Sequence, residues 1–397
     1  PDEARAKKLT ASNFKPAEYD YFADMDAAVD HEGAIKPRDL GPEEVKGRNA
    51  WMLWTGGNEA FWDWLARHGY GSMDLLKLID SQERRTRFKR AGLFTEPGMR
   101  EPDEKETKSA HGIRYDRPVD PNGPAPDPAV YGYPTGIVGL RLFKNPEFDS
   151  SAARNWNSKA YYTDPAYAQN PATIRPFRVG MSCGFCHTGV HPLAPPEGHD
   201  FQKSHEDPTW EWKNLSSTIG AQHLRFREVF GNNLETDNLL YHVVDSQIPG
   251  SLDTSLVASD NINNPNTMNA IFGVPARVNR ALNNPPETLS PEAAVYPGLF
   301  RDKDQEIWNT NPRHVPRILL DGSDSVGVWV ALARVYLNIG TYHQQWIRLH
   351  NPLLGFRPQE PFKLQDCEEN SVYWQATKLR VEPMASFFIA ATEPMNL

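Results

Sequence analysis

The chain has 397 residues, of which 39% are hydrophobic and 23% are charged, and its formal net charge is −9. Its mean hydropathy is −0.61, and no run of about 18 apolar residues occurs, which argues against a membrane-spanning helix. The acidic balance argues against nucleic acid as a partner, because phosphate recognition needs a concentrated basic face.

The N-terminal region is expected to be an extended arm. Residues 1–40 look like a segment that wraps the surface of the protein. The first residues, PDEARAKKLTASNF, lack a basic region followed by an apolar one, so we expect no secretory signal peptide. The whole chain is long enough for two or three domains, since single cores stop growing near about 250 to 300 residues.

Two helices are predicted next. Glu43 and Glu44 suit the positive end of a helix that follows Pro42, and residues 45–54 are mostly good helix formers. Two glycines end this helix, and Asn58 predicts the cap of a second helix that runs through residue 65. Residues 51–64 of these two helices contain an aromatic cluster: Trp51, Trp54, Phe61, Trp62 and Trp64. A cofactor lining is one interpretation, but an aromatic core between two helices is favoured.

The remaining elements are less regular. Residues 101–178 carry charges, prolines and glycines with little period, and we interpret them as a long loop insertion. Helices are predicted over 214–230 after the first turn of that segment, over 326–340, where the pattern is nearly all apolar, and over Val372–Ala391, where Pro383 should break or kink the helix. No sustained alternation of polar and apolar residues appears, so strands should be short and few.

Residues 183–187 read Cys-Gly-Phe-Cys-His, the attachment signature of a c-type haem. Two cysteines three positions apart lie on one turn of chain, so both sulfurs can form thioethers with the vinyl groups of one haem. His187 follows directly and is expected to bind the iron as the proximal ligand. The chain has only three cysteines, so a chance match is expected in on the order of one in a thousand proteins of this size.

Two other interpretations of the cysteine pair are less favoured. A redox dithiol is expected in a thioredoxin-like βαβ context, which the flanking RPFRVGMS and TGVHPLAPP do not supply. A zinc site could use His187 and His191, but the usual spacer of about a dozen residues between the cysteine and histidine pairs is missing. Cys367, the third cysteine, has no partner left and is expected to be a buried inert thiol.

The sixth iron ligand decides the function and stays open in the sequence. A tight His or Met ligand suits electron transfer, whereas a vacant position lets peroxide or dioxygen bind. The candidate ligands are Met268, His191, His199, His205, His223 and His242. His191 is disfavoured, because Pro192 restricts its path to the distal face. Side chains suited to an open catalytic site are Arg175, Arg178, Arg313, His314 and Trp308, although nothing in the sequence places them there.

Beyond the pentapeptide, the chain resembles the large bacterial c-type cytochromes of the di-haem cytochrome c peroxidase superfamily, and most of all the branch that contains the di-haem rubber oxygenase. The resemblance rests on the haem motif and on the segments NLSSTIGAQ (214–222), DNINNPNTMNAIFG (260–273) and ILLDGSDSVGVWVALARVYLNIG (318–340). It implies that Cys183 and Cys186 are thioether anchors and that His187 is the proximal ligand. Members of the superfamily carry two such motifs and this chain has one, so peroxidation that needs a second haem is not carried over.

These observations predict a mostly α fold, with a cytochrome c-like haem domain, long irregular proline-rich loops and few short strands. We divide the chain into the arm at 1–40, a haem c-binding helical domain at 41–345 that contains the insertion at 101–178, and a helical connector at 346–397. By the resemblance, the connector would lead to a second haem domain that this chain lacks.

The expected function is electron transfer by a cytochrome that binds one covalent haem c. The alternatives are a haem-dependent oxidoreductase, of peroxidase or oxygenase type with an open distal site, and a haem-bearing subunit of a larger complex. Covalent haem attachment takes place outside the bacterial cytoplasmic membrane, so the protein is expected to be a processed exported protein, periplasmic or extracellular. Its acidic surface would suit a basic redox partner protein. Substrate, reduction potential and oligomeric state stay open.

Overall fold

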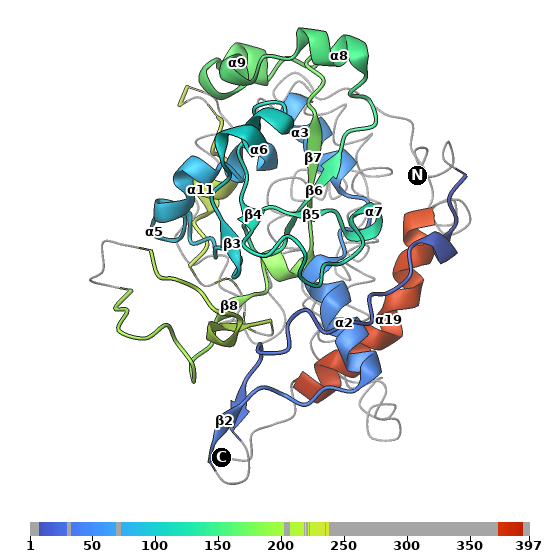
Figure 1. Cartoon of the computed structure of the whole chain (residues 1–397), viewed down its shortest axis with the longest axis vertical. Coiled ribbons are helices and arrows are strands. Elements are labelled where there is room, and N and C mark those ends of the chain that lie inside the picture. The colour runs from blue at the N-terminus through green and yellow to red at the C-terminus, as the bar shows by residue number, and fades with distance from the viewer. Residues whose placement is uncertain are drawn as a thin grey trace, which may run out of the picture.

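A computed structural model describes residues 8–29, 33–68, 73–201, 207–217, 219, 221, 223–234, 236–237 and 372–391. In these ranges the sheets are small and antiparallel, and helices, most of them short, lie around the three-stranded sheet near the centre (Figure 1). Helices take 38% and strands 11% of the residues that can be interpreted. The prediction of a mostly α fold is therefore wrong, because a large share of the described chain is strand or irregular.

The helices in chain order are η1 (Ala11–Asn13), α2 (Pro42–Leu53), α3 (Glu59–His68), α4 (Leu75–Leu78), η2 (Ser81–Thr86), α5 (Arg87–Ala91), α6 (Glu104–Ser109), α7 (Pro128–Tyr131), α8 (Ser150–Asn155), α9 (Ser158–Thr163), α10 (Pro165–Ala168), η3 (Cys183–Phe185), η4 (Trp212–Asn214), α11 (Phe226–Phe230) and α19 (Val372–Ala391). The strands are β1 (Ala28–Val29), β2 (Ile35–Lys36), β3 (Met99–Arg100), β4 (Arg117–Pro118), β5 (Tyr133–Pro134), β6 (Leu140–Lys144), β7 (Phe177–Met181), β8 (Gly189–Val190) and β9 (Leu215–Ser216). In the described ranges they pair as β1-β2, β3-β4, β5-β6-β7 and β8-β9.

Strands β5 and β6 of the three-stranded sheet, and the start of β7, lie in the segment that was predicted to be a loop. Strand β6 pairs antiparallel with β7, with Leu140 opposite Met181 and Lys144 opposite Phe177. Residues 101–178 also contain α6 to α10, so the interpretation as one long loop is corrected. Strand β6 gave little signal in the sequence, because it has only five residues and Leu140, Arg141 and Leu142 are buried in succession, without an alternation of buried and exposed side chains. Arg141 is tolerated there because its guanidinium donates to the carbonyls of Tyr131 and Gly132. The boundary at 345 lies outside the described residues.

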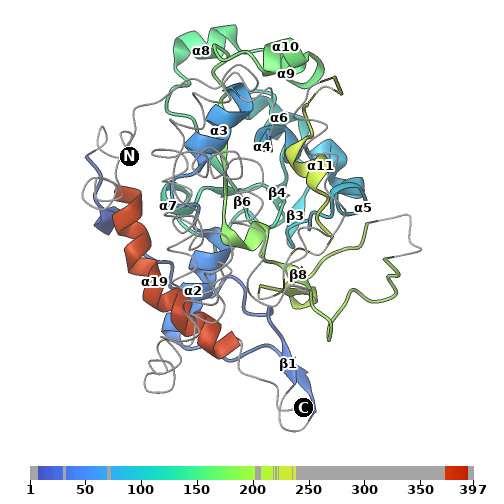
Figure 2. The ribbon, with the colours of Figure 1, turned by 180° about the vertical axis from the view of Figure 1, so that it is seen from behind.

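The two predicted N-terminal helices are confirmed as α2 and α3. Helix α3 packs against β7 and lies beside the sheet in the view from behind (Figure 2). Trp51, Trp54 and Trp62 are all buried, as the core interpretation expects. The N-terminal arm also contributes to the core, since Phe14 and Phe22 pack into the same cluster as Trp51 and Trp54.

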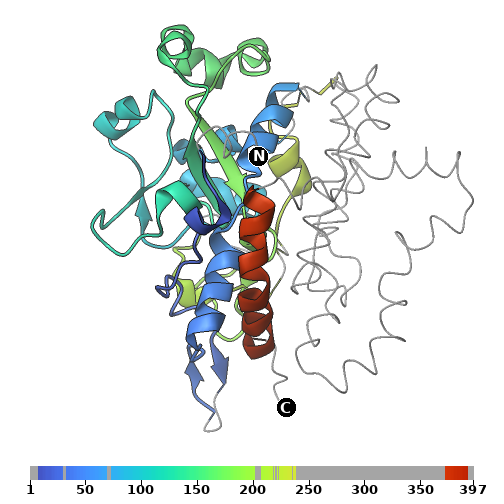
Figure 3. The same ribbon diagram turned by 90° about the vertical axis from the view of Figure 1, so that its right-hand side faces the viewer.

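Helix α19 runs alongside α2 (Figure 3), and its bounds match the predicted helix. The expected break at Pro383 does not occur, because the helix continues to Ala391. Proline removes the bond that would reach the carbonyl of Leu379. Leu379 is 48% exposed, so water can satisfy that carbonyl. No helix in the described ranges is long and apolar enough to cross a membrane.

The contact between α2 and α19 depends on Gly47. A Cβ atom at this position would lie 2.0 Å from the carbonyl oxygen of Pro383 and 2.7 Å from Cβ of Phe387. We expect Gly47→Ala to lower the free energy of unfolding by about 1–3 kcal/mol, because overpacking outweighs the gain of about 1 kcal/mol from the helix propensity of alanine. Urea denaturation measures this change.

Gly41→Ala is the matched control, because its Cβ would meet only the flexible carboxylate of Glu44. We expect this control to change the free energy of unfolding by less than about 1 kcal/mol. Equal losses in the two variants would show that α2 and α19 do not pack tightly at Gly47.

The helix predicted over 214–230, after the first turn, is confirmed only in its last part. Leu215–Ser216 forms β9 and pairs with β8, and only Phe226–Phe230 is helical, as α11. The side chain of Asp26 accepts hydrogen bonds from Ser217 N–H (2.6 Å) and from the Ser217 hydroxyl. The amide of Ser217 is therefore bound by a carboxylate from a distant part of the chain. The helix predicted over 326–340 lies outside the described residues.

Candidate functional site

The pentapeptide begins one residue after the last strand of the central sheet. Cys183 and Cys186 are held in one turn, because the Cys183 carbonyl accepts hydrogen bonds from the N–H of Cys186 (3.2 Å) and of His187 (3.1 Å). Strand β7 is buried along its length, so the turn is fixed at its N-terminal side by the core of the protein. Two sulfurs on one tight turn are the arrangement that attachment to a single haem requires.

Ser182 fastens the start of the turn to two other segments. Its N–H donates to the carbonyl of Gly139 (2.8 Å), and its hydroxyl donates to the carbonyl of Met52 (2.7 Å). Gly139 has a φ of +81°, and a Cβ there would lie 2.2 Å from the backbone nitrogen of Phe185. The turn therefore packs directly on the backbone before β6, and only glycine fits that position.

Asn58 holds the end of β7 from the opposite side. Its side-chain oxygen accepts the N–H of Met181 (3.0 Å), and its side-chain nitrogen donates to the Met181 carbonyl (2.7 Å). The sequence indicated a helix cap at this position, and the Asn58 carbonyl does accept the N–H of Trp62. The side chain of Asn58, however, makes two hydrogen bonds to the backbone of Met181, and we call this pair of bonds the clamp. No local sequence pattern predicts this contact.

Asn58→Ala removes this clamp and leaves both backbone groups of Met181 without these partners. We expect the free energy of unfolding to fall by about 1–3 kcal/mol, because buried groups lose their hydrogen bonds. Haem incorporation should also fall, since the turn loses one of its supports. Urea denaturation and the haem-to-protein ratio measure the two effects.

A suitable control is Asn122→Ala, which removes an exposed asparagine side chain in a loop. This variant should match the wild type in both measurements. If Asn58→Ala also matched the wild type, the clamp would have no role in holding the motif.

Both motif cysteines are free thiols at the meeting point of two hydrophobic clusters. Cys183 packs against the cluster that contains Trp51 and Trp54, and Cys186 packs against the cluster of the central sheet. Each residue is partly exposed as a whole, but burial of the sulfur raises the pKa of each thiol to about 12. A redox dithiol needs a lowered thiol pKa, so this environment argues against that function.

His187 presents a buried nitrogen with no partner. The residue is 4% exposed, and its Nε2 atom accepts or donates no hydrogen bond among the described residues. Burial lowers the pKa of the imidazole to about 4, so the ring is neutral at neutral pH, as a metal ligand must be. The Trp51 ring contacts it at a centroid distance of 5.1 Å and an interplanar angle of 49°. A buried, neutral, unpartnered nitrogen fits the role of proximal iron ligand.

His191 is committed to the backbone and is not an available ligand. Its Nδ1 accepts the N–H of Leu193 (3.2 Å), so its Nε2 carries the hydrogen and donates to the carbonyl of Ala27 (2.7 Å). This arrangement counts against both the zinc interpretation and a distal role for His191. In the described part of the chain, no group of three or more His, Cys, Asp or Glu side chains is placed to hold a metal ion.

The other candidates do not converge on the motif in the described residues. Arg175, which is buried and precedes β7, forms an ion pair with Asp74 (3.1 Å). Arg178, within β7, forms an ion pair with Glu147 (3.0 Å). His199 and His223 both pack against the ring of Phe201. The candidates His205, His242, Met268, Trp308, Arg313 and His314, and the cysteine Cys367, lie outside the described residues.

The residues present fit a covalent haem c. Two thiols on one turn and the adjacent unpartnered imidazole of His187 form the donor set that this group needs. Asn58, Gly139 and Ser182 hold that turn, and the sequence alone gave no signal for their roles. Each contacts residues far away in the chain, which local patterns do not report.

Comparison with known proteins gives no relative. No family model, no curated protein and no solved structure matches this chain. The pentapeptide and its surroundings are therefore the basis of the proposed function.

Proposed function

We propose that the chain is an exported c-type cytochrome that binds one haem covalently and transfers electrons. Cys183 and Cys186 would be the thioether anchors, and His187 would be the proximal ligand. The observation that carries the proposal is the buried Nε2 of His187, which has no hydrogen-bond partner in the described residues and directly follows the two cysteines. An orphaned buried nitrogen is costly unless a ligand takes it.

Each motif residue has a chemical role in this proposal. Each thiol would add its S–H across one vinyl group of the haem, with sulfur bonding to one vinyl carbon and hydrogen to the other, so no atom would be lost and no oxidant would be needed. When bound, the haem supplies an iron that takes up and releases one electron. His187, which is buried, would hold the iron.

The wider assignment is part of the same proposal. Haem attachment of this type implies a periplasmic or extracellular location in a bacterium, and the acidic charge of −9 favours docking with a basic redox partner protein. The segments quoted from 214–222, 260–273 and 318–340 support a relationship to the di-haem cytochrome c peroxidase and rubber oxygenase superfamily.

Mass spectrometry of the denatured protein tests the proposal. The chain, produced in a bacterium competent for cytochrome c maturation, should exceed its sequence mass by the mass of one haem. A denatured mass equal to that of the bare chain would refute covalent attachment.

The reaction with carbon monoxide separates electron transfer from oxygen chemistry. A six-coordinate relay should give a ferrous spectrum with sharp α and β bands that carbon monoxide does not change. A rapid spectral change on adding carbon monoxide would instead support the haem-dependent oxidoreductase of peroxidase or oxygenase type.

A further inference from the structure

Trp51 links His187 to a buried polar network. It lies near the end of α2, is 0% exposed, and packs its ring against the imidazole of His187. Its indole N–H donates to the carbonyl of Ser217 (2.9 Å). The ring is therefore fixed at both its face and its nitrogen, and its orientation is set by the position of Ser217.

Ser217 is in turn held by the carboxylate of Asp26. The Ser217 N–H donates to Oδ1 (2.6 Å), and its hydroxyl donates to Oδ2 (2.8 Å). The Ser216 hydroxyl also donates to Oδ1 (3.3 Å). Asp26 is 3% exposed and has a φ of +58°, so its backbone adopts the uncommon left-handed conformation that directs its carboxylate to this place. Because a strained backbone persists only where the surrounding structure holds it, these hydrogen bonds and the positive φ indicate that the fold fixes the Asp26 carboxylate in this position.

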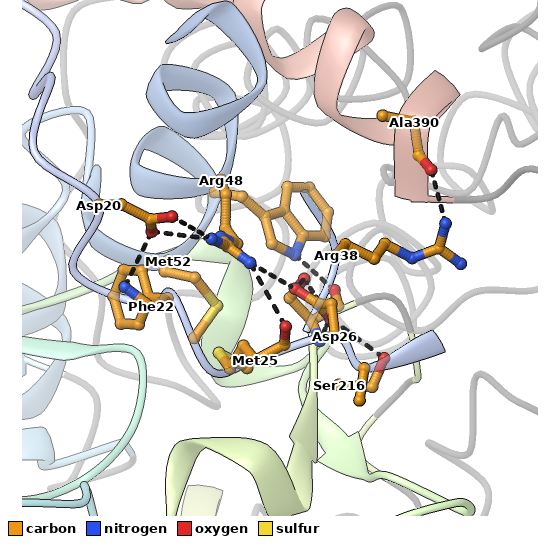
Figure 4. A network of polar contacts seen from close by, with 12 residues as sticks. Asp20, Phe22, Met25, Asp26, Arg38, Arg48, Met52, Ser216 and Ala390 are labelled. Carbon is orange, nitrogen blue, oxygen red and sulfur yellow. Dashed lines mark hydrogen bonds and ion pairs between the residues drawn. The ribbon is translucent and has the colours of Figure 1, made fainter. Parts of the chain in front are cut away.

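Arg48 only partly balances the charge of Asp26. Its Nη2 donates to both carboxylate oxygens of Asp20, at 2.7 Å each, and its Nη1 lies 3.6 Å from Asp26 Oδ2 (Figure 4). Arg48 is fully buried. Two carboxylates share one guanidinium, so the formal charge of the network is −1. Through Asp26, Ser217 and the indole N–H of Trp51, this charge is connected to the ring that packs against His187.

We propose that Trp51 and Asp26 are positioning residues for His187 and that they lower the reduction potential of the haem iron. Packing by Trp51 fixes the plane of the imidazole. The net negative charge of the network, in a low-dielectric interior, favours the more positively charged oxidised iron. This inference rests on the proposed function and adds to it how the protein sets the potential of its cofactor.

Potentiometric titration of the holoprotein tests the inference with Asp26→Asn and Trp51→Phe. Asp26→Asn keeps the shape of the side chain and removes its charge, so the midpoint potential should rise, and the ratio of reduced to oxidised protein at a fixed ambient potential should rise several-fold. Trp51→Phe keeps an aromatic ring but loses the indole N–H. It should shift the g values of the ferric electron paramagnetic resonance spectrum, which report the ligand plane.

Asp74→Asn is the matched control. Asp74 is a fully buried carboxylate that pairs with Arg175. Arg175 precedes the first residue of β7, whereas the motif follows the last residue of that strand. This variant should leave the potential and the g values at their wild-type values. A change equal to that in Asp26→Asn would mean that any loss of a buried charge has the same effect, and would overturn the proposal.

Asp20→Asn is the second variant, for the case in which Asp26→Asn does not fold. Asp20 is 30% exposed at its side chain, and its neutralisation takes the formal charge of the network from −1 to 0. The midpoint potential should again rise. Wild-type potentials in variants that retain haem would refute the inference and leave the proposed function intact, whereas a wild-type protein without covalent haem would refute the proposed function itself.

Discussion

The double variant Cys183→Ala, Cys186→Ala should carry no covalent haem. The chain has three cysteines, and only these two lie on one turn, where the Cys183 carbonyl accepts two backbone hydrogen bonds. Each single variant keeps one thiol and should form one thioether, so some haem should survive denaturation. The loss should therefore be partial in each single variant and complete in the double variant.

Haem staining after denaturing electrophoresis measures this effect, with the stain normalised to the amount of chain. Cys367→Ala is the matched control, because it removes a cysteine outside the motif and should stain like the wild type. Full staining of the double variant would show that the motif is not the attachment site.

The features that were predictable from the sequence are those encoded within a few residues of one another. The pentapeptide is one, since two thiols and an imidazole are adjacent in the chain. Helices α2, α3 and α19 are others, because capping signals, glycines and long runs of helix formers lie in continuous segments. Local patterns therefore sufficed for the turn that carries Cys183, Cys186 and His187 and for these three helices.

The features that were missed depend on contacts between distant segments. Asn58 clamps Met181, and Asp26 captures the amide of Ser217, each across more than a hundred residues. Strand β6 was missed because five residues with a buried Arg141 show too little alternation. In the sequence, a polar side chain such as that of Asn58 or Asp26 predicts a loop or a helix cap. Only the folded chain shows that it forms a hydrogen bond with a buried backbone group of a distant residue.

Gly139→Ala should be among the most damaging single substitutions near the site. The residue has a φ of +81°, and an added Cβ would lie 2.2 Å from the Phe185 nitrogen and 2.5 Å from its Cα. Both neighbours are backbone atoms of the turn that carries Cys183 and Cys186, so they cannot rotate away. We expect a loss of at least about 3 kcal/mol in the free energy of unfolding, from backbone strain and overpacking together.

Gly98→Ala isolates the clash from the strain. Gly98 also has a positive φ, of +76°, but nothing lies within 4 Å of its added Cβ. It should lose only about 1–2 kcal/mol, the penalty for a left-handed backbone. Urea denaturation of both variants therefore gives the steric part as a difference. Haem content should fall in Gly139→Ala alone, because only that substitution displaces the turn that carries Cys183 and Cys186. Equal stability losses and equal haem contents would show that the turn does not rest on Gly139.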